Sequence, residues 1–231
     1  MNHPVDTVFA VRQPTVAIEG RTARFPVHRI YCVGRNYAAH VREMGANPER
    51  EPPCFFMKPA DAVVPNGATV PYAARTSNFH HEIELVVAIG VGGRDLTRDA
   101  ALEHVFGYAV GNDLTRRDLQ AAAKNAGLPW DVSKGFDRSA PIAAIRPVTA
   151  GGHLGEGRIW LEVNGQVRQD ANLAEMIWTV PEILVELSSL YELQPGDLVF
   201  TGTPAGVGPV QRGDMLVGGV DGLETLRTTI A

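Results

Sequence analysis

Residues 78–90 restrict the fold of this 231-residue chain more than any other stretch. From Ile83 onward they form a run rich in valine and isoleucine that ends at a glycine-rich turn, the pattern of a buried β-strand. Two carboxylates, Glu82 and Glu84, stand where this apolar run begins. Alternate residues of a strand share a face and lie roughly 6–7 Å apart, so the two side chains point the same way. Because two such anions repel each other, the stretch predicts a cation between them.

The composition limits the partners of the chain. A net charge of -5 provides no basic field for nucleic acid or for an anionic membrane, and we expect neither as a partner. The two cysteines, Cys32 and Cys54, lie in apolar surroundings without a CxxC spacing, which indicates free thiols in a reducing compartment. The N-terminus lacks the apolar core of a signal peptide and no run of about 18 apolar residues occurs, so we expect a cytoplasmic protein.

The order of the expected elements indicates the fold class. Residues 8–11 and 15–18 are two short apolar runs, which predict a small strand pair. We interpret residues 1–25 as a short N-terminal strand appendage and residues 26–231 as a single domain. Many short strands, a few covering helices and the absence of a regular strand–helix alternation predict an α+β fold on a mixed or antiparallel sheet.

A short helix is expected directly after an apolar strand at residues 30–33. Asn36 is its predicted N-cap and Gly45 its predicted stop. On this helix His40 and Glu43 are three residues apart and therefore lie on one face. The plainer interpretation is a surface His–Glu pair on a solvated helix.

The rest of the chain adds strands, helices and turns. A strand over residues 55–59 carries Lys58 near its end, either as a site cation or as a lysine in water. Irregular backbone over residues 129–137 carries Lys134. The pair Asn164-Gly165 predicts a type I′ hairpin turn. The other expected elements are a helix over 96–105 capped by Thr97, a strand over 106–113, a polar helix over 114–126, a helical segment over 172–190 interrupted at Pro181, strands near 193–200 and 214–220, and a glycine-rich loop over 201–208.

A third acid, Asp113, joins Glu82 and Glu84 as a candidate cluster. All three lie at ends of apolar strands, where burying an unpaired carboxylate costs several kcal/mol. An all-oxygen set without a thiolate is the ligand chemistry of Mg²⁺, Mn²⁺ or Ca²⁺ rather than of zinc. The alternative is a metal-free salt-bridge network with one of three cations, Arg116, Lys134 or Lys58. The residues alone leave both interpretations open.

Five motifs together resemble the fumarylacetoacetate hydrolase family in its short bacterial form. They are Val-Gly-Arg-Asn-Tyr-Ala-Ala-His at 33–40, His-Glu-Ile-Glu at 81–84, Gly-Tyr-Ala-Val-Gly-Asn-Asp at 107–113, Lys-Gly-Phe-Asp at 134–137 and Thr-Gly-Thr-Pro-Ala-Gly-Val-Gly at 201–208. They follow one another in the family's order across residues 30–220. The resemblance implies a mixed β-sandwich-like roll, as in the family's C-terminal domain, over the catalytic domain 26–231. It also implies a homodimer with a bound divalent metal, Mg²⁺ or Mn²⁺, with Ca²⁺ as a further option.

The resemblance also implies roles for individual residues. The implied metal ligands are Glu82, Glu84 and Asp113, the implied catalytic residues are His40, Glu43 and Lys134, and the implied substrate contacts are Arg116, Gln120 and Thr203. Within the dyad, Glu43 would take a proton from water while His40 orients it and balances its charge. His81 stands beside the ligands and would either order them or merely pack.

The activity that the resemblance implies is metal-dependent hydrolysis of a carbon–carbon bond in an acylpyruvate. In residues 56–61 and 113–120 the chain is similar to members that cleave fumarylpyruvate to fumarate and pyruvate in gentisate-type aromatic degradation. The distal carboxylate of such a substrate would need a cation, for which Arg35, Lys58 and Arg116 are candidates. The alternatives are a less selective acylpyruvase, an oxaloacetate decarboxylase, a homoprotocatechuate-pathway isomerase or decarboxylase and, outside the enzymes, a metal-stabilised ligand-binding dimer.

Overall fold

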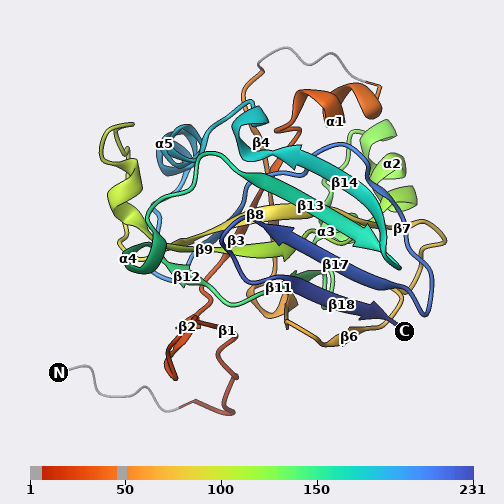
Figure 1. Ribbon diagram of the computed structural model, residues 1–231, viewed down its shortest axis with the longest axis horizontal. Coiled ribbons are helices and arrows are strands. Elements are labelled where there is room, and N and C mark those ends of the chain that lie inside the picture. The colour runs from red at the N-terminus through yellow and green to blue at the C-terminus, as the bar shows by residue number, and fades with distance from the viewer. Residues whose placement is uncertain (1–6, 46–50) are drawn as a thin grey trace.

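The computed structural model describes residues 7–45 and 51–231, and its frame is a pair of packed β-sheets (Figure 1). The strands of the larger sheet are β3 (Ile30–Gly34), β4 (Cys54–Lys58), β5 (Val63–Pro65), β8 (Ile83–Ile89), β9 (Val105–Asn112), β11 (Ala140–Ile142), β12 (Arg146–Pro147) and β15 (Leu198–Phe200). They run in the order β4-β3-β15-β8-β9-β11-β5, with β12 paired to β9. Strand β15 pairs in parallel with β3 and antiparallel with β8, so the sheet is mixed.

The second sheet has five strands and covers one face of the first (Figure 1). Its strands are β6 (Thr69–Val70), β13 (Arg158–Val163), β14 (Gln166–Asn172), β17 (Met215–Val220) and β18 (Leu226–Ile230). A three-stranded sheet is formed by β7 (Phe79–His81), β10 (Thr115–Arg116) and β16 (Gly208–Pro209). The expected α+β class with a mixed sheet is therefore confirmed.

Strand β8 is the centre of this arrangement, as its apolar sequence predicts. Every residue of β8 is buried, and the strand lies between β15 and β9. Its odd-numbered side chains join the core between the two sheets, whereas Val86 and Ala88 join a second core on the opposite face. Alternation along the strand gives Glu84 the face of Val86 and Ala88. The acid therefore points away from the five-stranded sheet.

The helices are short and lie around the sheets. They are α1 (Ala38–Glu43), α2 (Arg117–Asn125), α3 (Asp131–Lys134), α4 (Val148–Gly151) and α5 (Val180–Leu190), with 3₁₀ turns η1 (Ala60–Ala62), η2 (Ala101–His104) and η3 (Leu173–Glu175). Helix α5 packs over the core through Ile183, Leu184 and Leu187. Within the described ranges, no helix combines the length and the hydropathy of a membrane span.

The predicted N-terminal strand pair is wrong in one of its strands. Strand β1 (Thr15–Ala17) pairs with β2 (Arg24–Pro26) and not with residues 8–11. Gly20, at a φ of 67°, allows the chain to fold back between these strands. Val8 and Phe9 are 99% and 73% exposed. Residues 1–6 of the expected appendage lie outside the described residues.

The first helix differs from expectation at its start. Tyr37, not Asn36, precedes α1, and Asn36 is completely buried. The Asn36 amide donates to the carbonyls of Trp178 and Thr201, at 2.9 and 2.8 Å, and accepts from the Trp178 N–H at 2.7 Å. Because these buried backbone groups occupy the amide, it is not available to cap the helix. Gly45, at a φ of 73°, donates to the Arg42 carbonyl, so the predicted stop is confirmed.

Other differences are local. Residues 96–105 form no α-helix but turns and η2, and α2 begins at Arg117 because Thr115 and Arg116 pair with β7. The stretch expected to be irregular contains the short helix α3. The hairpin is confirmed, with Asn164 and Gly165 at φ values of 52° and 77°. The segment over 172–190 divides into η3 and α5, with the proline in the first turn of α5, where it is tolerated.

Candidate active site

Three carboxylates meet where β8 begins and β9 ends. Oxygen atoms of Glu82, Glu84 and Asp113 lie within 4.8 Å of one another, and all three residues are buried. The antiparallel pairing of β8 with β9 places Ile83 opposite Asn112, and the Asp113 N–H donates to the Glu82 carbonyl at 2.7 Å. The cluster predicted from the sequence is therefore brought together by strand register.

Three cations surround two of these acids. The Lys134 ammonium donates to Glu82 Oε2 at 2.6 Å and to Asp113 Oδ2 at 2.7 Å, and Lys58 lies 2.8 Å from Asp113 Oδ1. The Arg117 guanidinium pairs with Glu82. The salt-bridge network considered from the sequence is thus present, but with Arg117 in the place of Arg116.

The third acid has a different environment. Glu84 accepts the Gly202 N–H at 2.8 Å, and in the described part of the chain no lysine or arginine forms an ion pair with it. Burial, together with the charges of Asp113 and Glu82, raises the pKa of Glu84 well above its usual value. A buried carboxylate with free oxygen lone pairs beside two others is the donor set of a hard divalent cation. The residues present therefore fit the metal expected from the sequence.

Glu82 and Lys134 are both held in their charged forms, unlike Glu84. Burial by itself raises the pKa of Glu82, but the charges of Lys134 and Arg117 outweigh it and bring this pKa below its usual range. Burial lowers the pKa of Lys134, and the charges of Asp113 and Glu82 reverse this, so its pKa is raised. Glu82 and Lys134 therefore remain an ion pair at neutral pH.

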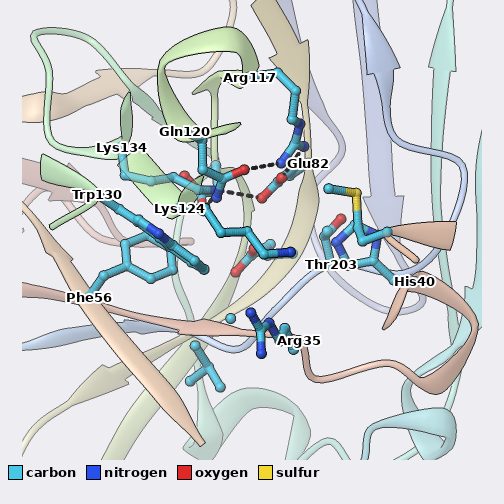
Figure 2. A pocket seen from close by; sticks show the side chains of 15 residues that line it. Arg35, His40, Phe56, Glu82, Arg117, Gln120, Lys124, Trp130, Lys134 and Thr203 are labelled. Atoms are coloured by element: carbon cyan, nitrogen blue, oxygen red, sulfur yellow. Dashed lines mark hydrogen bonds and ion pairs between the residues drawn. The ribbon is translucent and has the colours of Figure 1, made fainter. Parts of the chain in front are cut away.

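The expected His–Glu pair is present on α1. His40 Nδ1 lies 3.0 Å from Glu43 Oε2, and Glu43 Oε1 accepts the Gly206 N–H at 3.0 Å. The His40 ring lines the same cavity as the acids, to one side of Glu82 in Figure 2. The ring, with Nε2 not engaged by Glu43, is therefore the member of the pair that faces the cavity.

The cavity has an acidic floor, aromatic walls and a basic opening. It is open to solvent on one side, and its empty space, counted out to the mouth, is about 520 Å³. Phe56 and Trp130 form one wall, with ring centroids 5.7 Å apart. Figure 2 shows the Arg35 and Lys124 side chains extending toward the same open space. The cavity thus offers an oxygen-rich cation site and separate positive charges.

The structure divides the candidate substrate contacts. Arg35, Gln120 and Thr203 line the cavity. Lys58 does not, because its buried ammonium is held by Asp113 and by the carbonyls of Leu114 and Lys134. Arg116 does not either, because it donates to the Val132 carbonyl at 3.1 Å and stacks on Phe136. Lys58 and Arg116 are therefore no longer candidates for binding the distal carboxylate of the substrate.

Two lining cations were missed in the sequence. Arg117 donates to Gln120 at 2.6 Å, and Lys124 follows on the same helix. The positions 117, 120 and 124 have the spacing of one helical face, so a helix beginning at Arg117 would have identified them. Arg116 belongs to β10 and precedes the helix, and its side chain does not line the cavity.

His81 has a defined partner. Its Nδ1 lies 2.9 Å from Oε1 of Gln169, a buried residue of β14. Burial lowers the pKa of His81. It therefore belongs to a buried polar network next to the acids.

Most of the chain matches a known enzyme family. Residues 29–231 match the family described as Fumarylacetoacetate (FAA) hydrolase C-terminal. The chain belongs to the fumarylacetoacetate hydrolase family, as the sequence motifs indicate.

Particular relatives narrow the comparison. The chain is 47% identical over 176 residues to fumarylpyruvate hydrolase of Ralstonia sp, covering 76% of this chain and 91% of that protein. It is 42% identical to the mitochondrial oxaloacetate tautomerase FAHD1 of Mus musculus, over 86% of this chain and 89% of that one. The crystal structure of fumarylpyruvate hydrolase from Pseudomonas aeruginosa in complex with Mn²⁺ and pyruvate superposes with a TM-score of 0.96 at 52% identity, covering 98% of this chain and 99% of that chain.

Proposed function

We propose that this protein is a divalent-metal-dependent hydrolase that cleaves fumarylpyruvate to fumarate and pyruvate. The observation that carries the proposal is the buried triad Glu82, Glu84 and Asp113 at the floor of a cavity that the His40–Glu43 pair also reaches. The Mn²⁺ and pyruvate bound to the Pseudomonas aeruginosa relative support it. Following the family resemblance, we further propose a cytoplasmic homodimer that acts in gentisate-type aromatic degradation.

The triad would hold Mg²⁺ or Mn²⁺. An ion held by these three carboxylates would supply Lewis-acid stabilisation of the negative charge that develops on the 2-oxo group of an acylpyruvate. Lys134 is fixed by Glu82, Asp113 and Thr115, with 2.7 Å to the Thr115 hydroxyl. Its ammonium therefore adds a preorganised positive charge on the side where the enolate develops.

The His40–Glu43 dyad would activate a water molecule as the nucleophile. We expected Glu43 to take the proton from water, and the geometry instead favours His40 as the immediate acceptor, since its ring lines the cavity. Glu43 orients the ring and stabilises the imidazolium. The hydroxide formed from this water adds to the distal carbonyl carbon. The carbon–carbon bond between that carbon and the pyruvyl group then breaks, and its electron pair leaves with the pyruvyl fragment as an enolate. The proton gained by His40 is the one that the enolate carbon needs to become pyruvate.

Two cations suit the distal carboxylate of fumarylpyruvate. Arg35 and Lys124 line the cavity, and their side chains extend into the same space (Figure 2). Arg35 has a φ of 62°, which is uncommon for a residue other than glycine. Their charges support a dicarboxylate substrate over a neutral acylpyruvate.

We expect Lys124→Met to raise the KM for fumarylpyruvate by about tenfold, since a hydrogen bond to a charged group contributes about 1.5–3 kcal/mol. The KM for acetylpyruvate, which has no second carboxylate, should not change. Lys124→Arg keeps the charge and is the matched control. Equal losses on both substrates would contradict the assignment of Lys124.

The test of the function is pyruvate release from fumarylpyruvate, measured with Mn²⁺, after EDTA treatment and after Mn²⁺ is restored. We expect release with Mn²⁺, its loss on chelation and its recovery. Release that persists after chelation would refute the metal-dependent mechanism. No release from any acylpyruvate would refute hydrolysis.

Oxaloacetate is the second candidate substrate, because the Mus musculus relative is an oxaloacetate tautomerase. The His40–Glu43 pair favours hydrolysis over decarboxylation, which needs no attacking water, whereas a tautomerase would use the same pair for proton transfer. Steady-state rates on fumarylpyruvate, maleylpyruvate, acetylpyruvate and oxaloacetate would separate the two functions.

A further inference from the structure

One glutamine in an otherwise solvated hairpin strand is completely buried. Of the β14 residues, all of which the structure describes, Gln169 alone is buried. The register between β13 and β14 shifts at this point: Leu161 faces Gln169, whereas Glu162 faces Val167, so Arg168 is an extra residue. Such a bulge re-aims the side chains around it. Gln169 itself lies opposite Leu161, which is also buried, so its side chain points inward and reaches the start of β8 beside the acids.

The Gln169 amide uses all of its hydrogen-bonding capacity there. Its Oε1 accepts from the Ile83 N–H at 3.1 Å and lies 2.9 Å from His81 Nδ1. Its Nε2 donates to the Thr203 hydroxyl at 2.7 Å and to the Pro204 carbonyl at 2.9 Å. An amide has two donors and an oxygen with two lone pairs, so none is left unused. Gln169 therefore joins the start of β8 to the loop over residues 201–208.

That loop contacts both parts of the proposed active site. The Gly202 N–H donates to Glu84 Oε2 at 2.8 Å, and the Gly206 N–H donates to Glu43 Oε1 at 3.0 Å. Between them, the Thr203 hydroxyl donates to the Ile83 carbonyl at 2.8 Å. One loop thus orients a proposed metal ligand at one end and the dyad carboxylate at the other.

The loop is also pressed against the bulge. Gly206 has a φ of +94°, and a Cβ there would lie 1.9 Å from the Arg168 carbonyl oxygen. Only glycine allows this approach of two backbones. The position of the Gly206 N–H is therefore set by the bulged strand as well as by the Gln169 amide.

We infer that Gln169 is a positioning residue, which fixes the loop over 201–208 and thereby aligns Glu84 with Glu43. The inference rests on the proposed function for the roles of these two carboxylates. Gln169 forms no hydrogen bond with either of them, so its effect passes through the loop.

The test compares two variants of Gln169 with a control in the same hairpin. Gln169→Met keeps the length of the side chain and removes all four hydrogen bonds. Gln169→Glu keeps the two hydrogen bonds that Oε1 accepts. It replaces the donating Nε2 by an oxygen, which repels the Thr203 and Pro204 oxygens. Gln166→Met is the control, because Gln166 is exposed on the same strand. The measurements are the Kd for Mn²⁺ by calorimetry, kcat and KM on fumarylpyruvate with saturating Mn²⁺, and the Tm.

We expect both Gln169 variants to bind Mn²⁺ about 10–100-fold more weakly and to lose about 10–100-fold in kcat, as partners of metal ligands typically do. The control should match wild type. A folded Gln169 variant with a lower Tm but unchanged Kd and kcat would overturn the inference, because that is the result of a purely structural role. If Gln169→Met does not fold, the Kd and kcat of Gln169→Glu, which replaces a single heavy atom, test the inference.

The Mn²⁺ measurement needs no substrate. Wild type that binds Mn²⁺ but cleaves no acylpyruvate would refute the proposed function, while the change in Kd between wild type and variant would still test Gln169. Normal cleavage by wild type together with an unchanged Kd and kcat in the variants would refute the role of Gln169 alone.

Discussion

The Glu43→Gln variant is expected to hydrolyse fumarylpyruvate about 10²–10⁴-fold more slowly than wild type, the range typical of a lost general acid–base function. Glutamine keeps one acceptor oxygen, which can still accept the hydrogen bond from His40 and hold the ring in place. The bond from the Gly206 N–H is lost, and so is the negative charge that stabilises the imidazolium. Glu43 lies outside the acidic triad, and the Kd for Mn²⁺ should therefore stay within about twofold of the wild-type value.

Two comparisons sharpen this prediction. His40→Gln removes the cavity-facing ring and should lose as much in kcat as Glu43→Gln, because the two residues act as one unit. Glu103→Gln is the control, since Glu103 is an exposed carboxylate on η2 that does not line the cavity. Wild-type turnover by Glu43→Gln would refute the role of the dyad. A large loss of Mn²⁺ affinity would instead indicate that Glu43 supports the metal site.

The second large effect is expected for Lys134→Met. Without metal, this change leaves Glu82 and Asp113 with one buried counter-charge fewer, and breaking a buried pair in this way costs about 3–5 kcal/mol of unfolding free energy. Adding Mn²⁺ supplies positive charge at the same acids and should recover most of the lost Tm. Turnover should stay about 10²–10³-fold low even with saturating Mn²⁺, since a preorganised charge at the reacting atoms is missing.

Lys124→Met is the matched control for stability. Lys124 lines the same cavity but is exposed, so its loss should leave the Tm unchanged with and without Mn²⁺. Thermal unfolding and saturating-substrate kinetics on the two variants check the prediction. A Lys134→Met enzyme with normal kcat would show that the ammonium only balances the acids.

Features encoded by short spacings were predictable from the sequence. The apolar run of β8 with its two acids, the Asn164-Gly165 hairpin and the proximity of His40 to Glu43 all follow from strand or helix periodicity. Periodicity gave the wrong residues where a helix begins a few residues later than its sequence pattern predicts. The expected start of the helix at residue 114 is such a case, because Thr115 and Arg116 are in fact paired to β7 and the helix begins at Arg117.

Contacts between distant segments could not be predicted in this way. Asn36 looked like a helix cap, yet its amide is used by backbone groups more than 140 residues away. Gln169 could not be identified from the sequence, because its burial depends on the pairing of β14 with β13, which places it opposite Leu161. Lys58 was ambiguous until burial showed it bound to Asp113 and away from the cavity.

The sequence by itself determined that two acids share a strand face, that a third ends another apolar strand and that a histidine and a glutamate share a helical turn. These are properties of neighbouring residues, fixed by the 2-residue and 3.6-residue periods of the backbone. Only the tertiary structure decided which cations neutralise Glu82 and Asp113, that Glu84 lacks such a partner in the described chain and that one loop contacts both Glu84 and Glu43. Those outcomes depend on strand register and core packing between segments far apart in sequence, which local periodicity does not specify.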